Sequence, residues 1–130
     1  MLKRAISLVF ISTLILSGCS SSSDSATDLD PVAFKAKTQE PGVIVLDVRT
    51  TQEFNEGHIE NAININVESD TFLSQIESLD KSKSYAVYCR SGRRSADAIT
   101  KMANQNFTSL LNLNGGVIDW TNAGFALVTK

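Results

Sequence analysis

One segment of the sequence combines residue types that activate a sulfur nucleophile. Cys89 is followed by six residues that are cationic, hydroxylated or glycine, namely Arg90, Ser91, Gly92, Arg93, Arg94 and Ser95. The thiolate is the nucleophilic form of cysteine, and positive charge beside a thiol lowers its pKa. The segment therefore predicts that Cys89 is a reactive thiol in a loop that attracts anions. An inert buried thiol beside a solvated basic patch is the alternative interpretation.

The flanking residues predict a strand before Cys89 and a helix after the loop. Residues 85–88 form a short apolar run, as in a buried strand, and residues 95–106 place apolar side chains on one face, as in a helix. The first turn of a helix has free backbone N–H groups and carries the positive end of the helix dipole. Because Gly92 permits unusual backbone angles, the loop can fold its N–H groups into an anion-binding nest around the sulfur.

From Thr27 onward the chain alternates between patterns typical of strands and of helices. Further strands are expected at residues 43–46, 62–67 and 109–113, and further helices at residues 31–38, 71–79 and 117–121. This alternation predicts an α/β fold whose central, mostly parallel sheet has about five strands and carries helices on both faces. In such sheets ligands bind beyond the carboxyl ends of the strands, where Asp47 and Cys89 are both expected.

The first residues have the pattern of an export signal. Met1 to Arg4 is basic, and the apolar run from Ala5 to Leu16 is shorter than the roughly 20 residues of a membrane span. The sequence Leu-Ser-Gly-Cys at residues 16–19 resembles the lipobox of bacterial lipoproteins. The resemblance implies that residues 1–18 are a signal peptide and that Cys19 is lipidated and anchors the chain to a membrane. An uncleaved anchor helix and ordinary secretion are the alternatives.

Residues 19–26 are rich in serine, which predicts a flexible tether between the lipid anchor and a domain at residues 27–130. Ser20, rather than aspartate, follows the cysteine. By resemblance to Gram-negative lipoproteins, this favours the outer membrane over retention at the inner one. We therefore expect a domain that is anchored in a bacterial cell envelope and faces the periplasm.

Composition and cysteine count exclude several other classes of protein. The net charge of −2 becomes more negative when Lys3 and Arg4 leave with the signal, which argues against a nucleic-acid partner. A disulfide between Cys19 and Cys89 is possible in an exported protein, but lipidation of Cys19 leaves Cys89 as a lone thiol. We expect no metal and no cofactor, because the sequence has neither a cysteine–histidine cluster nor a nucleotide-binding motif.

The loop from Cys89 to Ser95 resembles the active-site loop of the rhodanese family. Other blocks match that family in the same order, namely Leu46–Arg49, Glu53–Phe54, Gly57–Ile59, Ala62–Ile65, Asn114–Gly116, Trp120 and Ala123–Gly124. Together the blocks cover nearly all of residues 43–125, and they most resemble single-domain periplasmic thiosulfate sulfurtransferases. The resemblance implies a rhodanese-like fold and a thiosulfate sulfurtransferase.

The mechanism that this resemblance implies is a double displacement. The Cys89 thiolate attacks the outer sulfur of thiosulfate or a similar anionic donor, and sulfite leaves. The N–H groups of Arg90 to Ser95 hold the resulting persulfide until cyanide or a small-molecule or protein thiol accepts the sulfur. The arginines guide the dianion and stabilise the departing sulfite. A non-catalytic module that binds an anion or a protein is the alternative, although inactive members of the family usually lack the cysteine.

The length of the loop argues against a cysteine phosphatase or an arsenate reductase. Cysteine phosphatases need an arginine six residues after the cysteine, where this chain has Ser95. Arg94 comes one position too early, and the shorter loop suits a single sulfur atom.

Other polar residues are expected to support the loop rather than to react. Asp47 and Arg49 are expected to hold the loop and neighbouring turns by charge-assisted hydrogen bonds, and Arg49 to pair with Glu53 at helical spacing. His58 is the only histidine, and in rhodaneses this residue is mainly structural. Trp120 is expected either in the core or as a wall of the substrate pocket.

Overall fold

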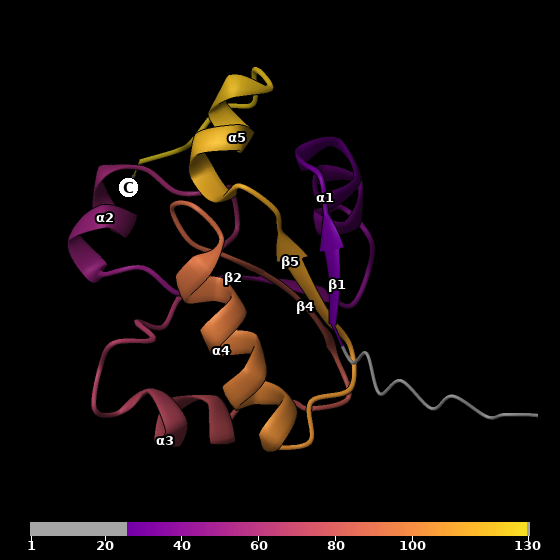
Figure 1. The fold of residues 1–130 in the computed structure, drawn as a ribbon, viewed down its shortest axis with the longest axis vertical. Helices are drawn as coiled ribbons and strands as arrows, with labels where there is room; N and C mark the ends of the chain where they lie inside the picture. The colour runs from indigo at the N-terminus through magenta and orange to yellow at the C-terminus, as the bar shows by residue number, and fades with distance from the viewer. Residues whose placement is uncertain (1–25, 130) are drawn as a thin grey trace, which may run out of the picture.

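The computed structural model describes residues 26–129, in which strands and helices alternate along the chain (Figure 1). The strands are β1 (Ala26–Leu29), β2 (Val43–Asp47), β3 (Ile63–Asn64), β4 (Ser84–Tyr88) and β5 (Leu110–Leu113). The helices are α1 (Pro31–Thr38), α2 (Thr51–Glu56), α3 (Phe72–Glu77), α4 (Arg93–Asn104) and α5 (Gly116–Asn122). The expected signal peptide, Cys19 and nearly all of the tether lie outside the described residues.

All five strands form one parallel sheet in the order β1-β5-β4-β2-β3. The α/β fold predicted from the sequence is therefore confirmed. The central strand β4 pairs with β2 on one side, where Leu46 faces Val87, and with β5 on the other, where Tyr85 faces Leu110. Because β4 has a neighbour on both sides, its carboxyl end is held in a fixed position.

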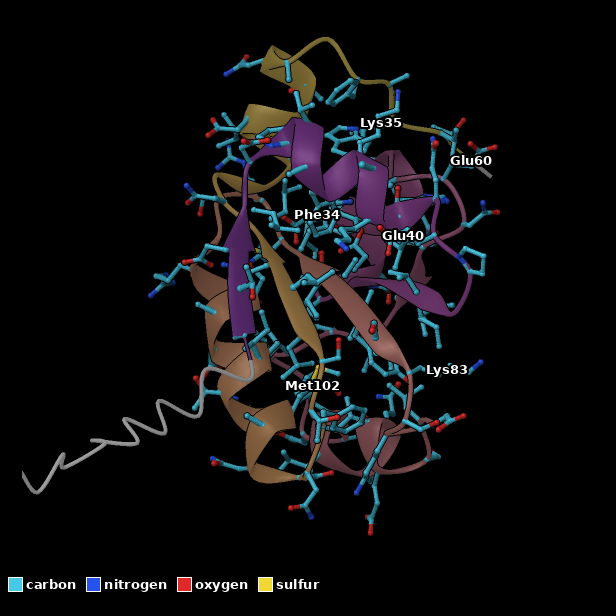
Figure 2. The ribbon with its side chains drawn as sticks, turned by 90° about the vertical axis from the view of Figure 1, so that its right-hand side faces the viewer. Phe34, Lys35, Glu40, Glu60, Lys83 and Met102 are labelled. Atoms are coloured by element: carbon cyan, nitrogen blue, oxygen red, sulfur yellow. The ribbon has the colours of Figure 1, made fainter. Side chains whose placement is uncertain are left out.

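Two hydrophobic clusters cover the two faces of the sheet. The first joins β4 residues such as Tyr85 and Val87 to α3 and α4, and the second joins the alternate residues Ala86 and Tyr88 to α1 and α5. In Figure 2, Met102 on α4 belongs to the first cluster, and Phe34 on α1 belongs to the second. The helices thus form a layer on each side of the strands.

Helix α1 follows the prediction residue for residue. Asp30 caps its first turn by accepting a 2.9 Å hydrogen bond from the backbone N–H of Ala33, and Pro31 is its first residue. The buried Phe34 fixes the helix against the sheet through edge-on contacts with the rings of Tyr88 and Trp120.

Three elements differ from the sequence prediction. The edge strand β1, in which Leu29 pairs with Leu113 of β5, was not predicted, and its first residue, Ala26, was expected to belong to the tether. The expected strand at 62–67 pairs with β2 only at Ile63 and Asn64, because the chain then turns away from the sheet. Helix α2 was not predicted; Thr50 and Glu53 form a capping box that starts it.

None of the helices within residues 26–129 is long and apolar enough to cross a membrane.

Candidate active site

Cys89 directly follows the last residue of β4, at the carboxyl edge of the sheet. Its side chain is fully buried. The backbone N–H of Gly92 donates a 3.0 Å hydrogen bond to Sγ, and the hydroxyl of Ser95 lies 3.4 Å from the same sulfur. Gly92 has a φ of 104°, a left-handed angle that side chains other than glycine rarely adopt. The loop therefore curls around the sulfur and directs polar hydrogens at it.

The pKa of the Cys89 thiol is lowered from its usual value. Burial raises this pKa because the charged form loses contact with water, but four hydrogen bonds to the sulfur outweigh that effect. They come from the hydroxyl of Ser95 and from the backbone N–H groups of Ser95, Gly92 and Ser91. The loop thus favours the thiolate, as the sequence predicted, with its hydrogen bonds as the main cause.

The three arginines of the loop lie in different surroundings. Arg94 forms two hydrogen bonds with Glu53, at 2.8 and 2.9 Å, and lies 3.8 Å from Glu68. This contact with Arg94 lowers the pKa of Glu53 to about 2. Arg90 and Arg93 are exposed, and neither has an ion-pair partner among residues 26–129. Of the three loop arginines, these two are therefore the ones that are exposed and unpaired within this part of the chain.

A hollow of about 170 Å³ lies next to the loop, and charges of both signs line it. Its residues are Val67, Glu68, Arg93, Arg94 and Asp97. The carboxylates of Glu68 and Asp97 offset part of the positive charge that the loop sequence suggested. The surroundings of the cysteine are thus mixed in charge rather than uniformly basic.

Asp47 and Arg49 form a buried ion pair with a 2.7 Å contact between Oδ2 and Nη2. Arg49 also donates a 2.6 Å hydrogen bond to the carbonyl of Gly57, and Asn64 donates to the carbonyls of both Asp47 and Arg49. The two residues therefore hold the segment between α2 and β3. The expected Arg49–Glu53 pair was wrong: Arg49 bonds to Asp47, while Glu53 bonds to Arg94.

His58 stacks on Phe54, with 3.8 Å between ring centroids. Its Nδ1 is 2.8 Å from the carbonyl oxygen of Phe54, and its backbone pairs with Val128. These contacts tie the end of α2 to the C-terminal segment. They give His58 a structural position, and the hydrogen bonds of the Cys89 sulfur go to Gly92 and Ser95 instead.

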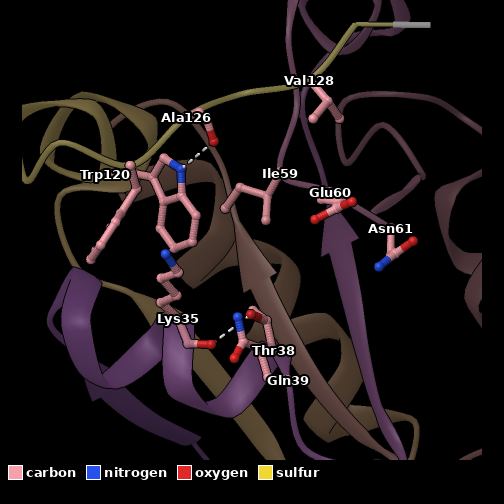
Figure 3. Close-up of a pocket in the computed structure, with 10 residues that line it drawn as sticks. Lys35, Thr38, Gln39, Ile59, Glu60, Asn61, Trp120, Ala126 and Val128 are labelled. Atoms are coloured by element: carbon pink, nitrogen blue, oxygen red, sulfur yellow. Dashed lines mark hydrogen bonds between the residues drawn. The ribbon is translucent and has the colours of Figure 1, made fainter.

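Trp120 is 4% exposed and belongs to the core cluster beneath α1. It also borders a separate hollow of about 200 Å³, which α1, residues 59–61 and the C-terminal segment enclose (Figure 3). Lys35 lies over the ring of Phe125 at the rim of this hollow, 4.4 Å from the ring centroid. No residue of the cysteine loop lines the hollow, so Trp120 does not form a wall of the cysteine site.

Two features of the site were missed from the sequence. Glu53 holds Arg94 from 41 residues away, a contact that spacing along the chain does not reveal. The turn at Gly115 and Gly116 packs against the backbone of the cysteine loop. The signal for the second was present, because two consecutive glycines between a strand and a helix indicate a close approach of backbones.

Fold and loop together define a protein that presents a stabilised cysteine thiolate at the carboxyl edge of a parallel α/β sheet. Residues 30–123 match the Rhodanese-like domain family, and the chain belongs to that family. A sulfurtransferase from Allochromatium vinosum is 31% identical over 66% of this chain and 78% of its own. A rhodanese-related protein from Thermoplasma volcanium has the same fold, with a TM-score of 0.70 and 27% identity over 79% of this chain and 98% of its own.

Longer proteins also contain a similar domain. A tRNA uridine(34) hydroxylase from Cytophaga hutchinsonii is 35% identical over 71% of this chain. The chain spans only 30% of that hydroxylase and about half of another relative. The match to the family therefore concerns a shared domain, which occurs in proteins of different length and name.

Proposed function

We propose that this protein is a sulfurtransferase that carries a sulfane sulfur on Cys89. The observation that carries the proposal is the loop geometry, in which Gly92 and Ser95 hold Sγ at 3.0 and 3.4 Å and lower the pKa of the thiol. A thiolate held in this way is a nucleophile without a neighbouring base. The relative from Allochromatium vinosum that is named a sulfurtransferase supports this proposal.

The reaction proceeds in two displacements. The Cys89 thiolate attacks the terminal sulfur of thiosulfate or a similar donor, the S–S bond of the donor breaks, and sulfite leaves with the bonding electrons. A thiophilic acceptor, such as cyanide or a thiol, then attacks the outer sulfur of the persulfide, and Cys89 leaves as a thiolate. The exposed Arg90 and Arg93 attract the anionic donor, and the loop N–H groups stabilise negative charge on sulfur in both steps.

Burial of Cys89 limits which donors react. Because its side chain is fully buried, a donor must present a small terminal sulfur that fits within the loop. The outer sulfur of thiosulfate meets this requirement, whereas a sulfur embedded in a bulky group does not. The proposal therefore includes selection of the donor by size as well as by charge.

The test measures transfer of sulfur from thiosulfate to cyanide by the full chain in detergent, with intact mass recorded after exposure to thiosulfate. The wild-type chain and the Cys19→Ser variant are expected to turn over and to gain the mass of a single sulfur atom. The Cys89→Ser variant is expected to do neither. If the wild-type chain neither turns over nor gains sulfur from any sulfane donor, the domain is a binding module instead.

We further propose that Cys19 carries a lipid that anchors the domain in the bacterial cell envelope, with the domain facing the periplasm. The sequence Leu-Ser-Gly-Cys at residues 16–19 after a short apolar run supports this location. Several acyl chains on one residue give a stable anchor, whereas a single chain does not.

A further inference from the structure

The first turn of α5 is bonded to the cysteine loop from behind. The backbone N–H of Val117 donates a 3.0 Å hydrogen bond to the carbonyl of Cys89, and the N–H of Ile118 donates a 3.2 Å bond to the carbonyl of Arg90. Both N–H groups belong to the first turn of the helix, where no carbonyl of the same helix is available. Two consecutive carbonyls of the loop are therefore fixed toward α5.

The direction of these carbonyls decides where the N–H groups of the loop point. A trans peptide is planar, so its N–H points away from its C=O. The carbonyl of Arg90 and the N–H of Ser91 belong to the same peptide. Because α5 holds this carbonyl on one side, the N–H of Ser91 points to the other side, where it bonds to the sulfur of Cys89. If this peptide rotated, it would direct a carbonyl oxygen at the thiolate.

Gly116 allows the close approach that these bonds need. A Cβ at this residue would lie 2.6 Å from the carbonyl oxygen of Cys89 and would also collide with the carbonyl group of Arg90. Its φ of 60° is also left-handed. Gly124, just beyond the same helix, has a similar φ of 86°, but a Cβ there would meet no atom within 4 Å. The two glycines share a backbone angle, and only Gly116 touches the loop.

We propose that Gly116 and the first turn of α5 are positioning elements that orient the peptides of the cysteine loop, so that their N–H groups face the sulfur. The proposal deepens the proposed function, since the thiolate that these peptides stabilise is the sulfur carrier there. It assigns α5 a task in the site that its backbone N–H groups perform. Binding of the Arg90 carbonyl and stabilisation of the thiolate are then coupled through the rigid plane of the peptide that joins Arg90 and Ser91.

The first test compares Gly116→Ala with Gly124→Ala in the full chain. Titration of the thiolate by its ultraviolet absorbance, with the Cys89→Ser spectrum subtracted, gives the thiol pKa without any sulfur donor. Gly116→Ala is expected to raise this pKa by about one unit, as for the loss of one hydrogen bond to a charged group, and to lower kcat more than it raises KM. Gly124→Ala is expected to leave the titration unchanged. Equal titrations of Gly116→Ala and wild type, or an equal rise in both variants, would overturn the proposal.

The second test keeps the glycine and removes one donor. Ile118→Pro deletes the N–H that bonds to the carbonyl of Arg90, and proline is tolerated in the first turn of a helix. Ile118→Val keeps the donor and has as many side-chain carbons as proline. We expect the thiol pKa to rise in the proline variant only, and an equal pKa in both variants contradicts the proposal. This pair decides the question if Gly116→Ala does not fold.

The titration separates the failure of this proposal from the failure of the proposed function. A wild-type thiol with a low pKa that never accepts sulfur would refute sulfur transfer and leave the role of α5 standing. Active sulfur transfer with an unaltered pKa in Gly116→Ala and Ile118→Pro would do the reverse.

Discussion

Replacement of Ser95 by alanine tests directly what holds Cys89 as a thiolate. Ser95 lies in the first turn of α4 and is fully buried. Its hydroxyl is 3.4 Å from Sγ and 3.1 Å from the carbonyl oxygen of Gly92, and it has one proton to donate to either acceptor. The substitution Ser95→Ala removes this proton and keeps the backbone N–H of the residue. It therefore removes one of the hydrogen bonds that lower the pKa of the thiol.

The expected magnitude follows from the geometry of that bond. A hydrogen bond to a charged group contributes about 1.5–3 kcal/mol. The contact with sulfur is long and the carbonyl of Gly92 competes for the same proton, so the lower end of this range applies. About 1.5 kcal/mol corresponds to a rise of about one unit in the thiol pKa. At a pH below both pKa values, the thiolate fraction then falls about tenfold.

The assay is a pH titration of the thiolate together with the rate at which the protein takes up sulfur from thiosulfate. In Ser95→Ala the uptake rate is expected to fall at low pH and to recover as the pH rises past the new thiol pKa. Ser91→Ala is the matched control, because Ser91 bonds to the sulfur through its backbone N–H, which alanine retains. If the thiol pKa of Ser95→Ala equals that of the wild-type protein, hydrogen bonding by the hydroxyl is not what stabilises the thiolate. A loss of rate that no increase in pH restores would contradict the argument equally.

Three further substitutions test the surroundings of the site. Glu53→Gln is expected to lower the free energy of unfolding in urea by about 1 kcal/mol at neutral pH, since its bond to Arg94 is partly solvated. Because folding lowers the pKa of Glu53 from 4.5 to about 2, the stabilising effect is present above pH 4.5, and the difference should vanish as the pH falls through that range. Asp47→Asn leaves the guanidinium of Arg49 buried without a counter-charge and should cost about 3–5 kcal/mol in the same measurement. Cys19→Ser should move the protein from the membrane fraction to the soluble fraction, and retention in the membrane fraction would contradict lipid anchoring.

The parts of the fold that depend on local pattern could be predicted from the sequence. Asp30 and Pro31 start α1 by capping and by a fixed φ, both of which act within a few residues. The apolar run before Cys89 indicates a central strand, because a strand that is buried on both faces has apolar side chains at consecutive positions. Because Cys89 directly follows this strand in a parallel sheet, its position at the carboxyl edge follows from the strand prediction.

Elements that depend on distant partners could not be predicted. Strand β1 has exposed side chains for most of its length, and its pairing with β5 brings together residues 84 positions apart, such as Asp28 and Asn112. Nothing in the short sequence Ala-Thr-Asp-Leu of β1 indicates such a partner. The short β3 likewise ends where the chain turns away from β2. The apolar pattern of residues 62–67 continues beyond that point, so it does not predict where the pairing stops.

The arginines of the loop illustrate the same limit at the site. Counted along the sequence, three guanidinium groups surround the thiol and suggest that charge stabilises the thiolate. In the fold, Arg94 turns to Glu53, and Arg90 and Arg93 are exposed to water, where a charge acts weakly on a buried sulfur. The backbone N–H of Gly92 remains effective because the loop fixes it 3.0 Å from the buried sulfur. The thiolate therefore depends on loop geometry, while the role proposed for the exposed Arg90 and Arg93 is to attract the anionic donor.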